Sequence, residues 1–210
     1  MAKIEEIIQA VESGKSKIVV GLVTEALNGG ADPVALLNDG LLRAMGNVGE
    51  KFGKGEVFVP EVLIAARAMK MGVEILKPSL AGKANVTKGK CVIGTVHGDL
   101  HDIGKNLVSM MIESAGYEIV DLGVDVSIDK FIKTIKENPD VKLVALSCLL
   151  TTTMPAMHET TKAIKASCAQ GIKVLVGGAP ITQGFADEAG ADGYSPDAGG
   201  AVQLVKKLVA

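Results

Sequence analysis

Apolar residues recur every three or four positions along the first eighty residues, a spacing that predicts amphipathic α-helices. Four such runs are separated by short polar or glycine-rich turns, and they cover residues 4–11, 18–27, 34–48 and 60–76. Asp32 and Pro33 supply an N-cap and a first-turn proline for the third run. Pro60 is expected to open the fourth run, and Lys77-Pro78 to close it. Four helices joined by short loops predict a small helical bundle.

The pattern changes after a segment without apolar periodicity, which we assign as a linker at residues 81–88. Beyond it, short β-rich runs alternate with helical patterns. The predicted strands are Cys91–Val96, Tyr117–Leu122, Leu143–Cys148, Val174–Val176 and a short one near Asp192–Tyr194, and the predicted helices are Ile103–Ala115, Ile128–Glu137, Ala156–Ala169, Thr182–Ala189 and Ala198–Val209. This alternation predicts a flavodoxin- or Rossmann-like, doubly wound α/β domain with a five-stranded parallel sheet. We therefore expect a helical cap domain at residues 1–80 and an α/β domain at residues 89–210.

The predicted sheet also indicates where a ligand would bind. In open parallel sheets, ligands bind beyond the carboxyl ends of the strands, at the point where the strand order reverses. In a 2-1-3-4-5 order this point lies between the first and third strands. The loops that follow Val96 and Ser147 are therefore the first candidates for a site.

Composition and charge narrow the class of function. The formal net charge is −2, so there is no basic excess to hold a nucleic acid. No apolar stretch approaches the ~18 residues of a membrane span, and the first residues lack the apolar run of a signal peptide. Cys91, Cys148 and Cys168 are widely spaced in apolar segments, which predicts buried, reduced thiols and a cytoplasmic location. The 25 glycines make up about 12% of the 210 residues, against a usual level of about 7%. This excess predicts that the backbone closely approaches some group.

The loop after the first strand concentrates candidate chemistry. It reads His97-Gly98-Asp99-Leu100-His101-Asp102-Ile103-Gly104. A phosphate loop fails because five residues separate Gly98 from Gly104 and Asn106 stands where a hydroxyl belongs. The GxGxxG dinucleotide fingerprint and the HExxH zinc motif are also absent from this loop. Two readings remain: a metal site with a single histidine, and a structural loop in which His101 only caps the next helix.

Three features favour the metal site. Asp99 precedes His101 by two residues, a spacing that lets a carboxylate hold the proton of one ring nitrogen while the other nitrogen faces a metal. Gly98 and Gly104 would let the backbone approach a large planar ligand. The loop also lies at the predicted point of strand-order reversal.

The order of these motifs resembles the cobamide (vitamin B12) binding signature. The matching segments are Asp99-x-His101-x-x-Gly104, Gly104-Lys105-Asn106, Val120-Asp121-Leu122-Gly123, Ser147-x-Leu149, Gly177-Gly178 and, in the helical half, Phe52 to Pro60. The chain is similar to the cobalamin-binding portion of methionine synthase. As a separate protein of this length, it resembles the corrinoid carrier proteins of methyltransferase systems more closely.

The resemblance implies a cobamide, either cobalamin or a related benzimidazolyl corrinoid, bound base-off and His-on. His101 would replace the cofactor's own lower base on cobalt, with Asp99 hydrogen-bonded behind it. Thr153 stands where methionine synthase has a serine that completes this relay. The displaced nucleotide tail would run into a slot between the first and third strands. The family's cofactor-binding positions correspond here to Gly98, Asp99, Leu100, His101, Asp102, Ile103, Gly104, Ser147, Leu149, Thr151, Gly177, Gly178 and Ala198.

The resemblance also implies a cap over the upper face of the corrin, made by Phe52, Val59 and Val62. Periodicity alone does not separate this role from a place in the bundle core. We favour Phe52 because it is expected in a glycine-flanked turn outside a helix.

The implied function is a methyl carrier without an activity of its own. It would take a methyl group from a donor on a substrate-specific methyltransferase and deliver it to an acceptor on a corrinoid:acceptor methyltransferase, with a reductive activator restoring the cobalt. The B12 subunit of an adenosylcobalamin mutase is an alternative that would not need the segment from Phe52 to Pro60. A B12-sensing regulator is another, which would need an output domain, and a module for a different cofactor is a third. Methanol, methylamines, methylated thiols, betaines and aromatic methyl ethers all remain possible donors.

Overall fold

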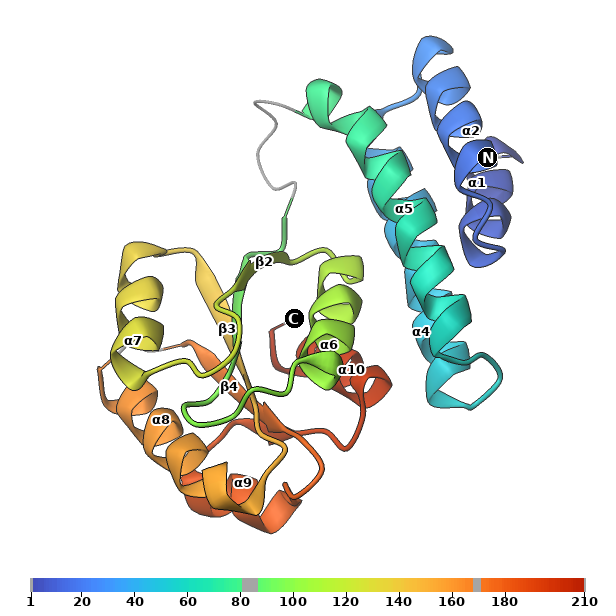
Figure 1. Cartoon of the computed structure of the whole chain (residues 1–210). Coiled ribbons are helices and arrows are strands. Elements are labelled where there is room, and N and C mark those ends of the chain that lie inside the picture. The colour runs from blue at the N-terminus through green and yellow to red at the C-terminus, as the bar shows by residue number, and fades with distance from the viewer. Residues whose placement is uncertain (1, 81–86, 168–170, 210) are drawn as a thin grey trace. The chain divides into compact units, whose positions relative to one another are not determined.

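A computed structural model describes residues 2–80, 87–167 and 171–209 (Figure 1). The chain divides into two compact units, one with helices α1 to α5 and one with the β-sheet and helices α6 to α10. The predicted linker lies almost entirely outside the described residues, as does Cys168. Among the described residues, no helix has both the length and the apolar character needed to cross a membrane.

The first unit is helical throughout, as the apolar period predicts. Its elements are α1 (Ala2–Glu12), α2 (Ser16–Asn28), α3 (Pro33–Ala35), the π-helix η1 (Leu36–Leu42), α4 (Arg43–Gly53) and α5 (Val59–Leu80). The third predicted helix is thus one helical run with a π-helical middle, and its N-cap is Asp32, whose side chain accepts a hydrogen bond from Ala35 N. The π segment buries Leu36, Leu37 and Leu41.

Two expected helix ends are wrong. Phe52 lies in the last turn of α4, because the helix continues to Gly53 and is stopped just beyond it by Gly55, whose φ of +72° is the left-handed conformation typical of a helix stop. Pro78 lies inside α5, which continues to Leu80. A proline so near a helix end removes few hydrogen bonds, and the burial of Leu76 and Leu80 favours the extra turn.

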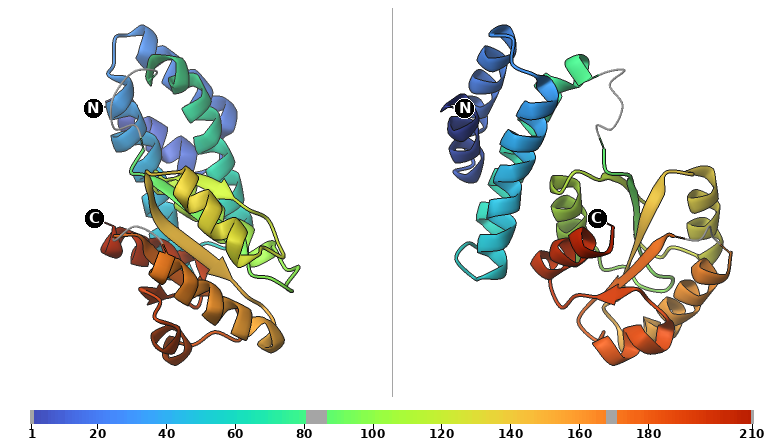
Figure 2. Two further views of the ribbon diagram at one scale, coloured as in Figure 1. Left: turned by 90° about the vertical axis from the view of Figure 1, so that its left-hand side faces the viewer. Right: turned by 180° about the vertical axis from the view of Figure 1, so that it is seen from behind.

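The second unit confirms the predicted doubly wound fold. Its strands are β1 (Lys90–Thr95), β2 (Glu118–Asp121), β3 (Val141–Ser147), β4 (Lys173–Gly177) and β5 (Gly193–Tyr194), and its helices are α6 (Ile103–Ser114), α7 (Ile128–Glu137), the 3-10 turn η2 (Thr151–Thr153), α8 (Met154–Ser167), α9 (Gln183–Ala189) and α10 (Ala198–Leu208). All strands are parallel in the order β2-β1-β3-β4-β5. Helices α6 and α10 cover one face of the sheet and α7 and α8 the other (Figures 1 and 2).

The sheet places the two candidate loops side by side. Strands β1 and β3 are neighbours, and Thr95 pairs with Ser147 at their carboxyl ends. One core cluster, which includes Phe131 of α7, Met157 of α8 and Ala186 of α9, also contains buried residues of β1, β3 and β4. The loops that follow β1 and β3 therefore meet where the strand order reverses, as the sequence predicts.

Candidate functional site

The loop after β1 is folded tightly against the strand ends. The backbone N–H of Asp99 donates to Val96 O at 3.2 Å, and Gly98 has a φ of +82°, which only glycine adopts readily. The buried Thr95 hydroxyl donates to His101 O at 2.8 Å. These bonds hold the short segment that carries Asp99 and His101.

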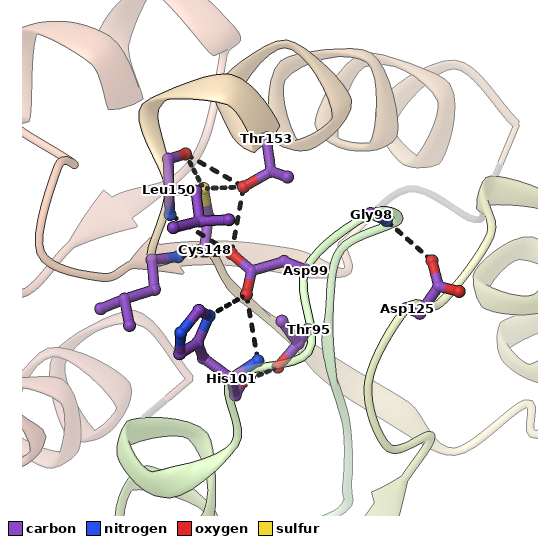
Figure 3. A network of polar contacts seen from close by, with 9 residues as sticks. Thr95, Gly98, Asp99, His101, Asp125, Cys148, Leu150 and Thr153 are labelled. Atoms are coloured by element: carbon purple, nitrogen blue, oxygen red, sulfur yellow. Dashed lines mark hydrogen bonds and ion pairs between the residues drawn. The ribbon is translucent and has the colours of Figure 1, made fainter.

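Asp99 and His101 form a directed pair (Figure 3). One carboxylate oxygen of Asp99, Oδ1, accepts from the backbone N–H of His101 at 3.0 Å and lies 2.7 Å from the ring atom Nδ1. The Asp99 side chain is fully buried, whereas the His101 side chain is 51% exposed. The buried carboxylate thus holds an imidazole ring whose other side is exposed.

The other carboxylate oxygen of Asp99 accepts hydrogen bonds from the residues that follow the neighbouring strand, β3. It accepts from Leu149 N at 2.7 Å, from Leu150 N at 3.3 Å and from the Thr153 hydroxyl at 3.0 Å. Cys148 lies beside this group, with its Sγ 3.2 Å from both Leu150 O and Thr153 Oγ1. The geometry expected of a relay through Thr153 is therefore present, and its functional role stays a prediction.

These donors determine the charge and tautomer of the pair. Burial alone would raise the pKa of Asp99, but hydrogen bonds from Leu149, His101 and Thr153 lower it to about 2. The carboxylate is ionised at neutral pH, and its contribution to stability is lost only as the pH falls from about 4 toward 2. Because an ionised carboxylate can only accept, Nδ1 of His101 carries the proton that faces it, and in the neutral ring the lone pair is then on Nε2. That tautomer suits a metal bound at Nε2.

Apolar side chains surround the pair. Leu100 is 72% exposed and Ile103 is 86% exposed, on either side of His101 in the chain. Leu149 and Leu150, whose N–H groups bind Asp99, are also exposed. Clustered exposed apolar side chains typically mark a binding surface. A metal held by one imidazole within an apolar, planar organic ligand fits this surface.

The positions of the predicted slot are occupied by glycine for different physical reasons. A Cβ on Gly104 would meet nothing within 4 Å, so its surface is open to a ligand. A Cβ on Gly178 would lie 1.7 Å from Cys148 O, and one on Gly177 would lie 3.3 Å from Ser195 O. Gly178 is therefore required by the approach of β3 to β4, whatever else it contacts.

The remaining predicted site residues lie at the same end of the sheet, where the strands finish. Ser147 ends β3, Thr151 is exposed in η2, and Ala198 begins α10 and is buried. Asp102 accepts from the Asn106 side-chain amide at 3.0 Å. The structure thus places all of these positions at or beyond the carboxyl ends of β1, β3, β4 and β5.

Sequence reasoning assigned no role to three residues that brace the site. Lys105, in the first turn of α6, is buried and pairs with Asp121 at 2.6 Å, at the end of β2. Both residues stand in the motif segments noted above, and the motif match was the one available signal. Thr95 carried no motif at all, because its bond to His101 O is made only in the folded loop.

The predicted cap residues differ in exposure. Phe52 is half-buried, Val59 at the start of α5 is exposed, and Val62 is fully buried. Their role over the corrin stays a prediction, and their exposure favours Phe52 and Val59 over Val62.

Comparison with known proteins bears on both units. Two family models, each described as a B12 binding domain, match residues 89–203 and 3–77. The chain is 43% identical to the trimethylamine corrinoid protein of Methanosarcina barkeri over 98% of both chains, and 42% identical to dimethylamine corrinoid protein 1 of Methanosarcina acetivorans over 99% of this chain and 97% of that protein. Its structure matches one chain of the methanol:cobalamin methyltransferase complex of Methanosarcina barkeri with a TM-score of 0.88 at 31% identity, covering 99% of this chain and 80% of that chain. The chain therefore belongs to the family of B12-binding corrinoid proteins, with a helical B12-binding domain followed by an α/β one.

Proposed function

We propose that this protein is a methyl carrier of a methylamine methyltransferase system and that His101 is the lower ligand of its cobalt. One observation carries the assignment of His101: an exposed imidazole is held by a buried, ionised Asp99 so that Nε2 is free. A corrinoid bound here would supply the chemistry, namely a cobalt nucleophilic enough in its reduced state to accept a methyl group. The protein controls the axial ligand, the tautomer and access.

Each group around the site has a defined task in this proposal. Asp99 holds the proton of His101 Nδ1, and Thr153 with the backbone of Leu149 and Leu150 holds Asp99. The exposed apolar side chains of Leu100 and Ile103 would offer the macrocycle an apolar surface beside His101. The loops beyond β1, β3 and β4 receive the nucleotide tail.

The donor is proposed from the relatives. Full-length similarity above 40% to proteins named for trimethylamine and dimethylamine supports a methylamine as the methyl donor. The partners are then a methylamine-specific methyltransferase, a second methyltransferase that uses the methylated corrinoid, and a reductive activator. Burial raises the pKa of the Cys91 and Cys148 thiols, and such unreactive free thiols support a cytoplasmic location.

The test is methylation of the reduced, corrinoid-loaded protein. It is mixed in turn with trimethylamine-, dimethylamine- and methanol-specific methyltransferases and their substrates, and the methylated form is followed by its absorption spectrum. We expect the fastest methylation with one of the methylamine enzymes. Methylation by the methanol enzyme alone would overturn the donor class, and methylation by none would overturn the carrier function for these donors.

Substitution of Asp99 should weaken ligation by His101. Asparagine has one acceptor oxygen, whereas Asp99 accepts at both oxygens, so Asp99→Asn leaves either the imidazole or the Leu149 N–H facing an amide donor. Loss of such a partner typically costs about 10–100-fold in metal affinity. We expect the histidine-off form to be favoured and its pH dependence to shift, measured by spectroscopic titration of the methylated protein.

Thr153→Val is the graded comparison. It removes one donor from Asp99 and leaves the bonds from Leu149 and Leu150 in place. Its effect should have the same direction and be smaller. If Asp99→Asn titrates like the wild type, Asp99 serves only to fold the loop.

Substitution of Phe52 should expose the upper ligand. Phe52→Ala removes a half-buried aromatic ring from the last turn of α4, so we expect faster loss of the methyl group to light or water with tail binding unchanged. The measurement is the photolysis rate of the methylated protein. A rate equal to that of the wild type would assign Phe52 to the bundle core.

A further inference from the structure

We propose that Asp125 is a positioning residue that holds the loop of Asp99 and His101 in its ligating form, an inference that rests on the proposed role of His101. Asp125 lies in the loop between β2 and α7. It is 24 positions from His101 in the sequence, and it belongs to none of the motif segments that carry the family resemblance.

Asp125 contacts three consecutive residues of the loop. Its Oδ1 accepts from Gly98 N at 2.7 Å (Figure 3). The same oxygen lies 2.7 Å from His97 Nδ1. Its own backbone N–H donates to Asp99 O at 2.9 Å. The side chain and the backbone of one residue therefore hold the segment on which the Asp99 carboxylate is mounted.

The segment that carries Asp125 is itself anchored to β1. Thr95 N donates to Gly123 O at 3.0 Å, and Val126 N donates to Thr95 O at 3.0 Å. Gly123 N donates to Asp121 Oδ1 at 2.8 Å, and the other oxygen of Asp121 pairs with the buried Lys105 of α6. The segment that carries Asp125 is thus held in place by β1 and Asp121. Loss of the Asp125 contacts should therefore move the loop of Asp99 and His101 and leave this segment in place.

The backbone of Asp125 adopts an uncommon conformation. Its φ is +51°, and no other residue except glycine has a positive φ in the part of the chain that the structure describes. The left-handed region disfavours side chains, and aspartate and asparagine tolerate it better than most. Glycine would relieve this strain, but it would lose both side-chain contacts. Strained residues of this kind are enriched where function requires a defined geometry.

Charge reinforces the contacts. The Gly98 N–H and the neighbouring His97 hold the pKa of Asp125 below its ordinary value, so the side chain is ionised at neutral pH. Asp99 therefore has two supports from different strands: its carboxylate is bound by residues after β3, and its backbone carbonyl is bound by Asp125 after β2. The hydrogen bond from Asp125 N to Asp99 O thereby sets the position of the Asp99 carboxylate relative to His101.

Three variants separate positioning from stability. Asp125→Gly removes the side-chain contacts and relieves the strain, Asp125→Asn keeps an acceptor oxygen and tolerance of positive φ, and His97→Ala removes only one exposed contact. The first measurement is the nitrogen hyperfine coupling in the Co(II) spectrum of the corrinoid-loaded protein. The second is amide hydrogen exchange at Gly98 and His101 in the protein without cofactor, with thermal unfolding as the stability control.

For Asp125→Gly we expect an unfolding midpoint near that of the wild type, faster exchange at both amides and about a tenfold loss of the nitrogen-ligated form. Asp125→Asn should restore ligation, and His97→Ala should change it little. Wild-type coupling and exchange in Asp125→Gly would overturn the inference, as would a lowered unfolding midpoint with unchanged coupling. If the wild type itself lacks nitrogen coupling, ligation by His101 fails, and the exchange rates still decide whether Asp125 holds the loop.

Discussion

The His101→Ala protein is expected to fold normally and to hold its corrinoid without a nitrogen ligand beneath the cobalt. The His101 side chain is half exposed and makes its one described side-chain hydrogen bond to Asp99, so the core loses little when it is removed. Partners behind a metal ligand commonly contribute about 10–100-fold to metal affinity, and the ligand itself should contribute at least as much.

The measurement is the Co(II) spectrum of protein made with ¹⁵N-labelled histidine. Wild-type protein should show coupling that responds to the label, and His101→Ala should show none. His97→Ala is the matched control, because His97 lies in the same loop, is exposed and also pairs with an aspartate, Asp125, at 2.7 Å. Unchanged coupling in His101→Ala, or its loss in His97→Ala, would show that the ligand is misassigned.

The Gly178→Ala protein is expected to be strongly destabilised even without cofactor. The new Cβ would stand 1.7 Å from Cys148 O and 2.7 Å from Cys148 C, and the φ of +134° is unfavourable for any side chain. Cys148 N donates to Gly177 O at 3.1 Å in the same place, so the end of β3 cannot move away from β4 without breaking the sheet. We expect a loss of about 3 kcal/mol or more in the free energy of unfolding.

Thermal unfolding of the cofactor-free protein checks this expectation, since that loss corresponds to a fall of about 6–12 °C in a chain of this size. Gly104→Ala is the control, because a Cβ there meets no atom within 4 Å and alanine is a better helix former than glycine. Gly104→Ala should keep the wild-type midpoint and bind the corrinoid more weakly. An unchanged midpoint in Gly178→Ala would mean that the strands can separate after all.

Sequence reasoning succeeded where the signal is local. The change from a helical period to alternating strands and helices predicted both units. No end of a predicted strand differs from the observed end by more than two residues. It failed at Phe52, where two glycines indicated a turn but only Gly55 has the conformation that ends the helix. It also failed at Pro78, where tertiary burial of Leu76 and Leu80 outweighs the local preference.

The site shows the same division. Asp99, His101 and Gly104 lie within six residues, so their spacing favoured a metal-binding loop, and the order of this motif with the others along the chain carried the resemblance to B12 proteins. The reason for Gly178 is different: it is an approach of β3 to β4, where the sequence had suggested room for a ligand.

By itself, therefore, the sequence determined the two folds, the strand alternation and the choice of Asp99 and His101 as the candidate pair, because helical period, strand period and short motifs are written in neighbouring residues. Only the tertiary structure decided what holds that pair. The donors to Asp99 come from Leu149, Leu150 and Thr153, some fifty residues away, and the hold on its backbone comes from Asp125. Such contacts depend on the order of parallel strands and on loop conformation, which bring distant residues to one edge of the sheet.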